Sequence, residues 1–426
     1  MGESLNYVLA GVAAVGVLCM WIRGWLFTTC VLVSFALIYS ARYTQTIVPV
    51  RVALLAFLTI GLLALIFEGR VDLSRRAKFL SALLIVASVS LNLLGLSITD
   101  ESSSESLFRY TLLFPLAGLS GFIFSRSGKG PLVARIYVIV TLFMSLLAVV
   151  ERLSGSFIVA GTYENAGRLV RDGTVRSIVF AEHPLVLSVL LICALPFVSK
   201  AIHPRWLCFM AYISIVAGII CTNSRGALVL LGIWVVVAIA DRMGLLKSGL
   251  TKILKILAAV IAALAFLGLL LGSGSEQLDS SSAVDASAEY RTALYTFAAR
   301  SLIERPLGWG ISGLPEGTYF ATSLFGSLDV SKTVDSELAL AMFDFGWLGL
   351  AAFVTTTFAL LRPRRIASSF GQAAFLATAS GLYLALHSWT GLGSLWWLLI
   401  GLAFGLKDVK NPPASDAEQR LQDQRR

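Results

Sequence analysis

The sequence has little charge. Only 14% of its 426 residues are charged, whereas 57% are hydrophobic, and the mean hydropathy is +0.81. A soluble chain of this size needs more charge to cover its surface, which excludes a soluble globular protein. Cysteine and histidine are also scarce: the 5 cysteines form no CxxC pair and the 3 histidines no HxxxH spacing. These absences argue against a disulfide framework, and we predict neither a metal site nor a cofactor.

Long apolar segments are abundant instead. They recur along the chain at about the length that crosses a bilayer, so we predict an all-α polytopic membrane protein with twelve or thirteen transmembrane helices. The predicted spans are 5–22, 25–41, 51–67, 79–98, 108–124, 132–150, 184–199, 205–221, 226–240, 252–272, 337–361, 370–388 and 393–406.

Basic residues between the spans predict the orientation. They cluster around residues 70–78, 126–135, 200–205, 242–255 and 362–365, which assigns these loops to the cytoplasmic side. The net charge of +9 therefore reflects membrane topology and not a nucleic-acid partner. The predicted organisation is transmembrane helices over 1–272 with a periplasmic loop at 151–183, a large periplasmic loop with short amphipathic helices at 273–336, transmembrane helices over 337–406, and a cytoplasmic tail at 407–426.

Arginines gather on the predicted periplasmic side, where positive residues are usually sparse. An arginine side chain donates bidentate hydrogen bonds to phosphate and stays charged at any working pH, so the set indicates a diphosphate held at the outer membrane surface. The alternative is that these arginines pair with nearby carboxylates or with lipid headgroups. The candidates are Arg176, Arg225, Arg291, Arg300 and Arg305.

The segment from Glu289 to Glu304 has helical periodicity. Its apolar face predicts a helix lying flat on the bilayer, which Pro306 ends. The glycine-rich stretch 308–313 follows, and we interpret it as a flexible turn that offers backbone N–H groups to an anion.

Asp335 lies immediately before a predicted span. It is either the N-cap of that helix or a general base that takes a proton from a sugar hydroxyl. Glu337 competes for the role of base, and Asp344 lies about two turns deeper, where an ionisable group needs a partner. His183 and His387 stand at outer span ends and are further candidate substrate-binding residues.

Three motifs together resemble the O-antigen ligase and Wzy-type polymerase superfamily of bacterial envelope glycosyltransferases. Ser224-Arg225-Gly226-Ala227 opens a span, and Arg291 precedes the stretch Glu304-Arg305-Pro306-Leu307-Gly308-Trp309-Gly310. Asp335-Ser336, nine residues, Gly346, two residues and Gly349 are similar to the ligase signature His-[Asn/Ser/Gln]-x9-Gly-xx-Gly in all but the first residue.

This resemblance implies an inverting, metal-independent transferase in the bacterial inner membrane, with its active site facing the periplasm. It also implies an undecaprenyl-diphosphate-linked glycan as donor and a sugar or lipid-linked acceptor. Arg225 and Arg291 match the family's arginines and would neutralise the diphosphate leaving group.

Asp335 stands where the ligases have histidine, which favours a polymerase of exopolysaccharide or O-antigen repeat units. Besides membrane lipids, a polymerase could have a chain-length regulator as a partner. A ligase to lipid A-core remains an alternative, as does a lipid-linked oligosaccharide flippase, although a flippase should carry charges through several spans.

Overall fold

The computed structural model describes residues 26–39, 50–67, 108–158, 170–171, 174–181, 183–243, 277–278, 283–310, 313–323, 326–332 and 334–406. The predicted spans 5–22, 79–98 and 252–272 and the tail from residue 407 lie outside these residues.

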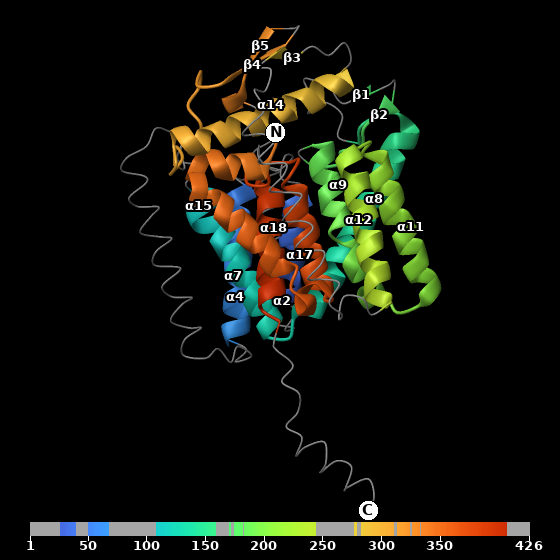
Figure 1. Ribbon diagram of the computed structural model, residues 1–426. Helices are drawn as coiled ribbons and strands as arrows, with labels where there is room; N and C mark the ends of the chain where they lie inside the picture. The colour runs from blue at the N-terminus through green and yellow to red at the C-terminus, as the bar shows by residue number, and fades with distance from the viewer. Residues whose placement is uncertain are drawn as a thin grey trace, which may run out of the picture.

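The described chain is a bundle of apolar helices (Figure 1). Arg205–Cys221 has the bounds predicted for its span, and most other helices agree with prediction within a few residues. The helices of the bundle are α2 (Leu26–Tyr39), α4 (Val50–Phe67), α7 (Phe114–Arg126) after the π-helical turn Arg109–Leu113, α8 (Gly130–Ser154), α9 (Pro184–Ile192), α10 (Val198–Ala201) after the 3₁₀ turn Leu195–Phe197, α11 (Arg205–Cys221), α12 (Arg225–Arg242), α15 (Glu337–Leu360), α16 (Pro363–Ile366), α17 (Ser369–Ser380) and α18 (Thr390–Phe404).

The outward faces of these helices are apolar. Within the described residues, three helical segments are long and apolar enough to cross a membrane: Gly130–Ser154, Pro184–Ala201 and Glu337–Leu360. Large side chains such as Phe143 on α8, Phe209 on α11 and Val236 on α12 are exposed, as lipid-facing residues must be. The all-α membrane fold is thus confirmed.

Small residues allow the central helices to approach closely. A Cβ added to Gly121 of α7 would lie 2.1 Å from the carbonyl oxygen of Leu398 on α18, and one added to Gly401 would lie 1.9 Å from that of Gly118. Without side chains at these positions the two backbones pack directly against each other, a common arrangement in membranes.

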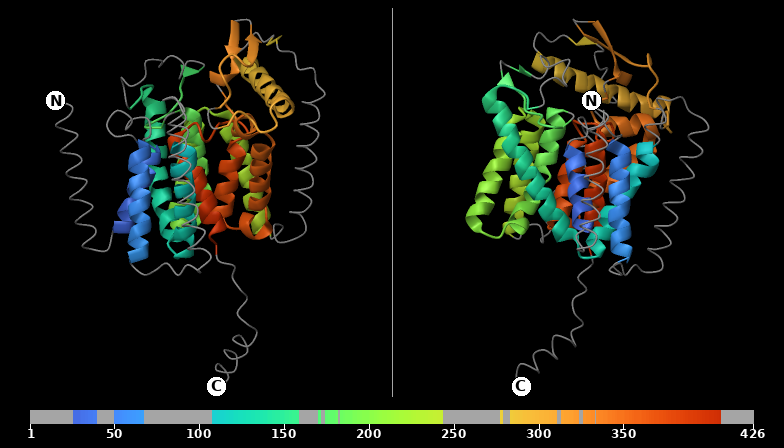
Figure 2. Two further views of the ribbon diagram at one scale, coloured as in Figure 1. Left: turned by 90° about the vertical axis from the view of Figure 1, so that its left-hand side faces the viewer. Right: turned by 180° about the vertical axis from the view of Figure 1, so that it is seen from behind.

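One end of the bundle carries a polar cap (Figures 1 and 2). Helix α14 (Ala283–Glu304) lies across this end, next to a small sheet of β3 (Gln277–Leu278), β4 (Phe320–Ser323) and β5 (Gly326–Asp329). Strand β4 pairs parallel with β3 and antiparallel with β5. The hairpin of β1 (Val170–Arg171) and β2 (Thr174–Val175) lies at the same end. The two long loops therefore share one face, as predicted, although their short strands were not predicted.

Helix α14 buries the apolar face that its periodicity indicates, but against α15 and not against the bilayer as predicted. Tyr290, Leu294, Phe297 and Ser301 are all buried, and the apolar members of this set pack against Phe343 of α15 in a second, smaller core. This packing holds α14 against the start of α15.

The predicted span 370–388 is wrong at its end. Helix α17 ends at Ser380, and residues 381–389 form an irregular connection to α18. The carbonyl of Gly381 accepts hydrogen bonds from the amides of Glu337 and Leu338, and that of Leu384 accepts a second bond from the Glu337 amide. These hydrogen bonds hold the residues that follow α17 against the start of α15.

Candidate functional site

A kink in α15 joins two of the sequence motifs. Gly346 has φ 57° and ψ −135° inside the helix, a conformation reserved for glycine. The loop after α14 fills the gap: the amides of Trp309 and Gly310 donate to the carbonyls of Phe343 and Asp344, and the amide of Trp347 donates to that of Pro306. The amides of this glycine-rich loop are therefore already hydrogen-bonded within the protein. Our interpretation that they bind an anion is wrong for residues 308–310.

The cap of α15 is Ser336 and not Asp335. The Ser336 hydroxyl accepts a hydrogen bond from the amide of Ala339 at 3.4 Å and contacts the Tyr295 hydroxyl at 2.9 Å. Among the described residues, the Asp335 carboxylate has no hydrogen-bond partner. Of the two roles weighed for Asp335, the capping role therefore belongs to its neighbour, and this carboxylate is available for chemistry.

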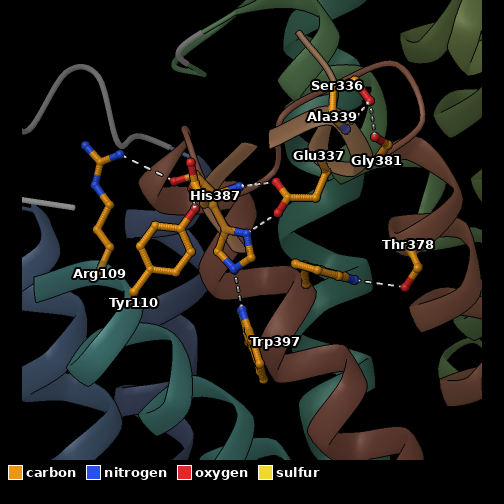
Figure 3. Close-up of polar contacts among 11 residues, drawn as sticks. Arg109, Tyr110, Ser336, Glu337, Ala339, Thr378, Gly381, His387 and Trp397 are labelled. Atoms are coloured by element: carbon orange, nitrogen blue, oxygen red, sulfur yellow. Dashed lines mark hydrogen bonds and ion pairs between the residues drawn. The ribbon is translucent and has the colours of Figure 1, made fainter. Parts of the chain in front are cut away.

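Glu337 and His387 clamp the start of α15 to the 381–389 connection (Figure 3). One Glu337 carboxylate oxygen accepts the His387 amide at 2.9 Å, and the other contacts the Nδ1 of the ring. The His387 Nε2 accepts the indole N–H of Trp397 at 2.9 Å, which places the ring proton on Nδ1. Both groups are nearly buried, and each already has partners.

The deeper carboxylate, Asp344, has a partner for one of its oxygens, while its Oδ1 is buried without a hydrogen-bond partner among the described residues. It is 2% exposed, and the Tyr110 hydroxyl donates to its Oδ2 at 3.1 Å. The Tyr110 ring lies against the His387 ring, with centroids 4.6 Å apart, so Asp344 and the clamp form one buried polar layer under the cap.

A cavity of about 300 Å³ opens beside Asp335. Polar groups from the cap and aromatic groups from the bundle share its wall, a combination suited to a sugar. It is lined by Gly313, Leu314, Ser331, Lys332, Val334, Asp335, Leu340, Phe343, Ala385, Ser388 and Trp389.

Arg291 of α14 lies close enough to Asp335 for its charge to act on that carboxylate. The surrounding protein raises the pKa of Asp335 by desolvation, although solvent reaches part of the side chain, and the Arg291 guanidinium opposes this rise. Among the described residues, the Arg291 Nε is itself buried without a hydrogen-bond partner. Tyr295, one turn after Arg291 on α14, contacts Ser336 beside Asp335 at 2.9 Å, so the cation and the carboxylate belong to neighbouring segments.

The arginine motif at the start of α12 contacts the 381–389 connection. Ser224 begins the helix, its hydroxyl accepting the Ala227 amide at 3.4 Å, and Arg225 is exposed. The Nε of Arg176 donates to the carbonyl of Thr222 at 3.2 Å, which places Arg176 beside this turn. Gly226 lies against the ring of Tyr383, within 3.0 Å of the position a Cβ would take.

The remaining predicted residues lie around this centre. His183 caps α9 by accepting the Leu185 amide at 3.2 Å, and its ring stacks on Trp389 of the cavity wall with centroids 5.9 Å apart. Arg300 lies nine residues beyond Arg291 on α14, roughly 13 Å along the helix axis. Its Nε contacts Glu304 at 2.8 Å, and Arg305 is exposed after the helix end. As substrate-binding residues, Arg300 and Arg305 stay predictions.

Residues 209–354 match the family model described as O-antigen ligase. This stretch of the chain is similar to the O-antigen ligase family and is here called the O-antigen ligase domain. The resemblance stated from the three motifs is thereby confirmed, and a membrane glycosyltransferase of the O-antigen ligase and polymerase type is supported. No match to the chain is found among curated proteins.

The O-antigen ligase domain contains Arg225, Arg291 and Asp335 but not the whole site. Tyr383, His387 and Trp389 lie beyond its end. Through the fold Tyr383 lies against Gly226, His387 bonds to Glu337, and Trp389 lines the cavity beside Asp335. Tyr383 and Trp389 were not among the predicted site residues. Tyr383 lies in the predicted span 370–388 and Trp389 comes immediately after it, and the only local signal was the polar pair His387-Ser388 before Trp389.

Proposed function

We propose that the protein is a periplasm-facing glycosyltransferase of the bacterial inner membrane that joins polysaccharide repeat units. It transfers a glycan from an undecaprenyl-diphosphate-linked donor to a sugar acceptor. The observation that carries the proposal is the cavity lined by Asp335, whose carboxylate does not cap α15, with the helix that carries Arg291 packed beside it.

Asp335 is the general base in this proposal. It takes the proton of the acceptor hydroxyl, whose oxygen attacks the anomeric carbon of the donor. The bond between that carbon and the diphosphate oxygen breaks, and undecaprenyl diphosphate leaves with the electron pair. A single displacement of this kind inverts the anomeric configuration. The raised pKa of Asp335 makes its carboxylate a better proton acceptor than an ordinary aspartate.

Arg291 and Arg225 stabilise the departing diphosphate. Their charges act where negative charge develops, and Arg291 has a buried Nε with a free hydrogen-bonding position. Arg176, beside the Arg225 turn, adds positive charge on the same side. Glu337 and His387, predicted as substrate-binding residues, are here positioning residues, because their contacts fix the segment that follows Asp335.

The cavity holds the acceptor sugar. Trp389 offers an aromatic surface to the apolar face of a sugar ring, with His183 stacked on it. Lys332 and Ser388 supply donors for hydroxyl or carboxyl groups.

A second candidate is a ligase that attaches the finished glycan to lipid A-core, since the matching family model is described as O-antigen ligase. The length and amount of attached glycan in a strain lacking this protein distinguish a polymerase from a ligase. A polymerase predicts that long chains disappear while single units stay attached. A ligase predicts that all attached glycan disappears. Attached glycan that is unchanged in this strain would reject both functions.

A further inference from the structure

The hydroxyl of Tyr383 is buried and has no hydrogen-bond partner in the described part of the chain. A tyrosine that reaches the interior normally finds a partner for its hydroxyl, because a buried unpaired polar group is costly. Tyr383 lies in the irregular connection between α17 and α18, at the capped end of the bundle. The fold thus holds a hydrogen-bond donor in place without satisfying it.

A second unpaired donor belongs to the helix that packs beside Tyr383. The Tyr295 hydroxyl, one turn after Arg291 on α14, donates to the carbonyl of Leu382, the residue before Tyr383. Within the described residues the Nε of Arg291 is also buried without a partner, and its positive charge acts on Tyr383. An oxygen atom of a ligand that sits between them would accept from both. Two donors, one of them cationic, select an anionic oxygen.

The ring of Tyr383 joins the two arginine motifs. Its Cε2, Cζ and Cδ2 atoms lie 2.8, 2.9 and 3.0 Å from the position of a Cβ on Gly226, so only glycine at 226 allows this approach. Arg225 precedes that glycine on the same helix start. Tyr383 therefore stands between the segment that carries Arg225 and the helix that carries Arg291.

We propose that Tyr383 is a third diphosphate-binding residue, whose hydroxyl donates a hydrogen bond to a phosphoryl oxygen of the lipid-linked donor beside Arg291. This inference rests on the proposed function and adds a residue outside the O-antigen ligase domain to the donor site. The hydroxyl is sheltered from water, which strengthens a hydrogen bond to a charged oxygen.

The test is Tyr383→Phe, which removes only the hydroxyl. Binding of undecaprenyl diphosphate to the purified full chain in nanodiscs of neutral lipid is measured by native mass spectrometry, with undecaprenol as the phosphate-free probe. We expect diphosphate affinity to fall about tenfold or more and undecaprenol affinity to stay unchanged. Because the hydroxyl has no partner in the fold, the Tm should stay equal or rise. Tyr212→Phe on α11 is the matched control and should bind as wild type.

Two further arms separate the failures. If Tyr383→Phe binds diphosphate as wild type while Arg291→Ala loses it, the role of Tyr383 is overturned and the proposed function stands. If both variants bind as wild type, the diphosphate site itself is wrong. If Tyr383→Phe instead loses only phosphatidylglycerol, added to the nanodiscs as a competing source of phosphate, the hydroxyl holds a lipid headgroup and the proposal is overturned.

Discussion

The carbonyl oxygen of Pro306 lies where a side chain at Gly346 would begin, 2.0 Å from the position of an added Cβ. This contact locks the loop after α14 into the kink of α15. The loop and the kinked helix come from two separate motifs of the O-antigen ligase domain, and their union holds α14 against α15.

Gly346→Ala is therefore expected to disrupt the site. The added methyl would overlap the Pro306 carbonyl at a residue with positive φ, and strain of this kind costs about 1–3 kcal/mol before the overlap is counted. The Tm in detergent and the polymer made in a deletion strain should both fall. Gly232→Ala in α12 is the control, since a Cβ there meets nothing within 4 Å. A Gly346→Ala protein with wild-type Tm and polymer would contradict the role of the kink.

Asp335→Asn should lower the turnover about 10²–10⁴-fold, the usual contribution of a general base, with little change in Tm because the carboxylate holds no hydrogen bond in the fold. Asp335→His, which restores the residue of the ligase signature, should keep part of the activity. Glycan transfer by the purified protein measures both. Full activity in the asparagine variant would exclude the base role.

The pH dependence of turnover follows from the same group. A base acts only when deprotonated, so activity is lost as the pH falls through the pKa of Asp335. Since desolvation raises that pKa, the loss should begin at higher pH than for an ordinary aspartate, and Arg291→Ala should move it higher still because its charge lowers the pKa. A pH profile that Arg291→Ala shifts downward, or leaves in place, would show that the two side chains do not interact as described.

Arg291→Lys keeps the charge but loses the planar fork, so polymer formation should drop severalfold to tenfold or more. Arg242 lies at the other end of α12 from Arg225, so Arg242→Lys is the matched control and should leave polymer length unchanged. Wild-type polymer from the Arg291→Lys strain would reject bidentate binding of the diphosphate.

Glu337→Ala should destabilise the protein by about 1–3 kcal/mol, because it leaves the His387 amide and the Nδ1–H of its neutral ring without their acceptor in a buried site. The Tm measures this loss, and Glu337→Gln, which keeps an acceptor oxygen, should recover part of it. Glu316→Ala, at an exposed carboxylate, serves as control. Equal Tm values for Glu337→Ala and wild type would show that the contacts between Glu337 and His387 do not stabilise the protein.

Local chemistry made much of the fold predictable. Segments such as Arg205–Cys221 and Glu337–Leu360 can be recognised in the sequence, because a helix that crosses lipid must be apolar over a fixed length. The buried face of α14 was predictable for a similar reason, since its apolar residues recur with the helical period. Neither inference needs knowledge of a distant residue.

The sequence by itself determined the membrane class, most of the helices, the motifs that carry Arg225, Arg291 and Asp335, and the resemblance that residues 209–354 confirm. Tertiary structure alone decided that Ser336 caps α15, that His387 holds Glu337, and that Trp389 lines the cavity beside Asp335. The reason is physical: hydropathy and helical period depend on neighbouring residues, whereas hydrogen-bond partners, unpaired donors and cavities depend on which backbones the glycine contacts allow to meet.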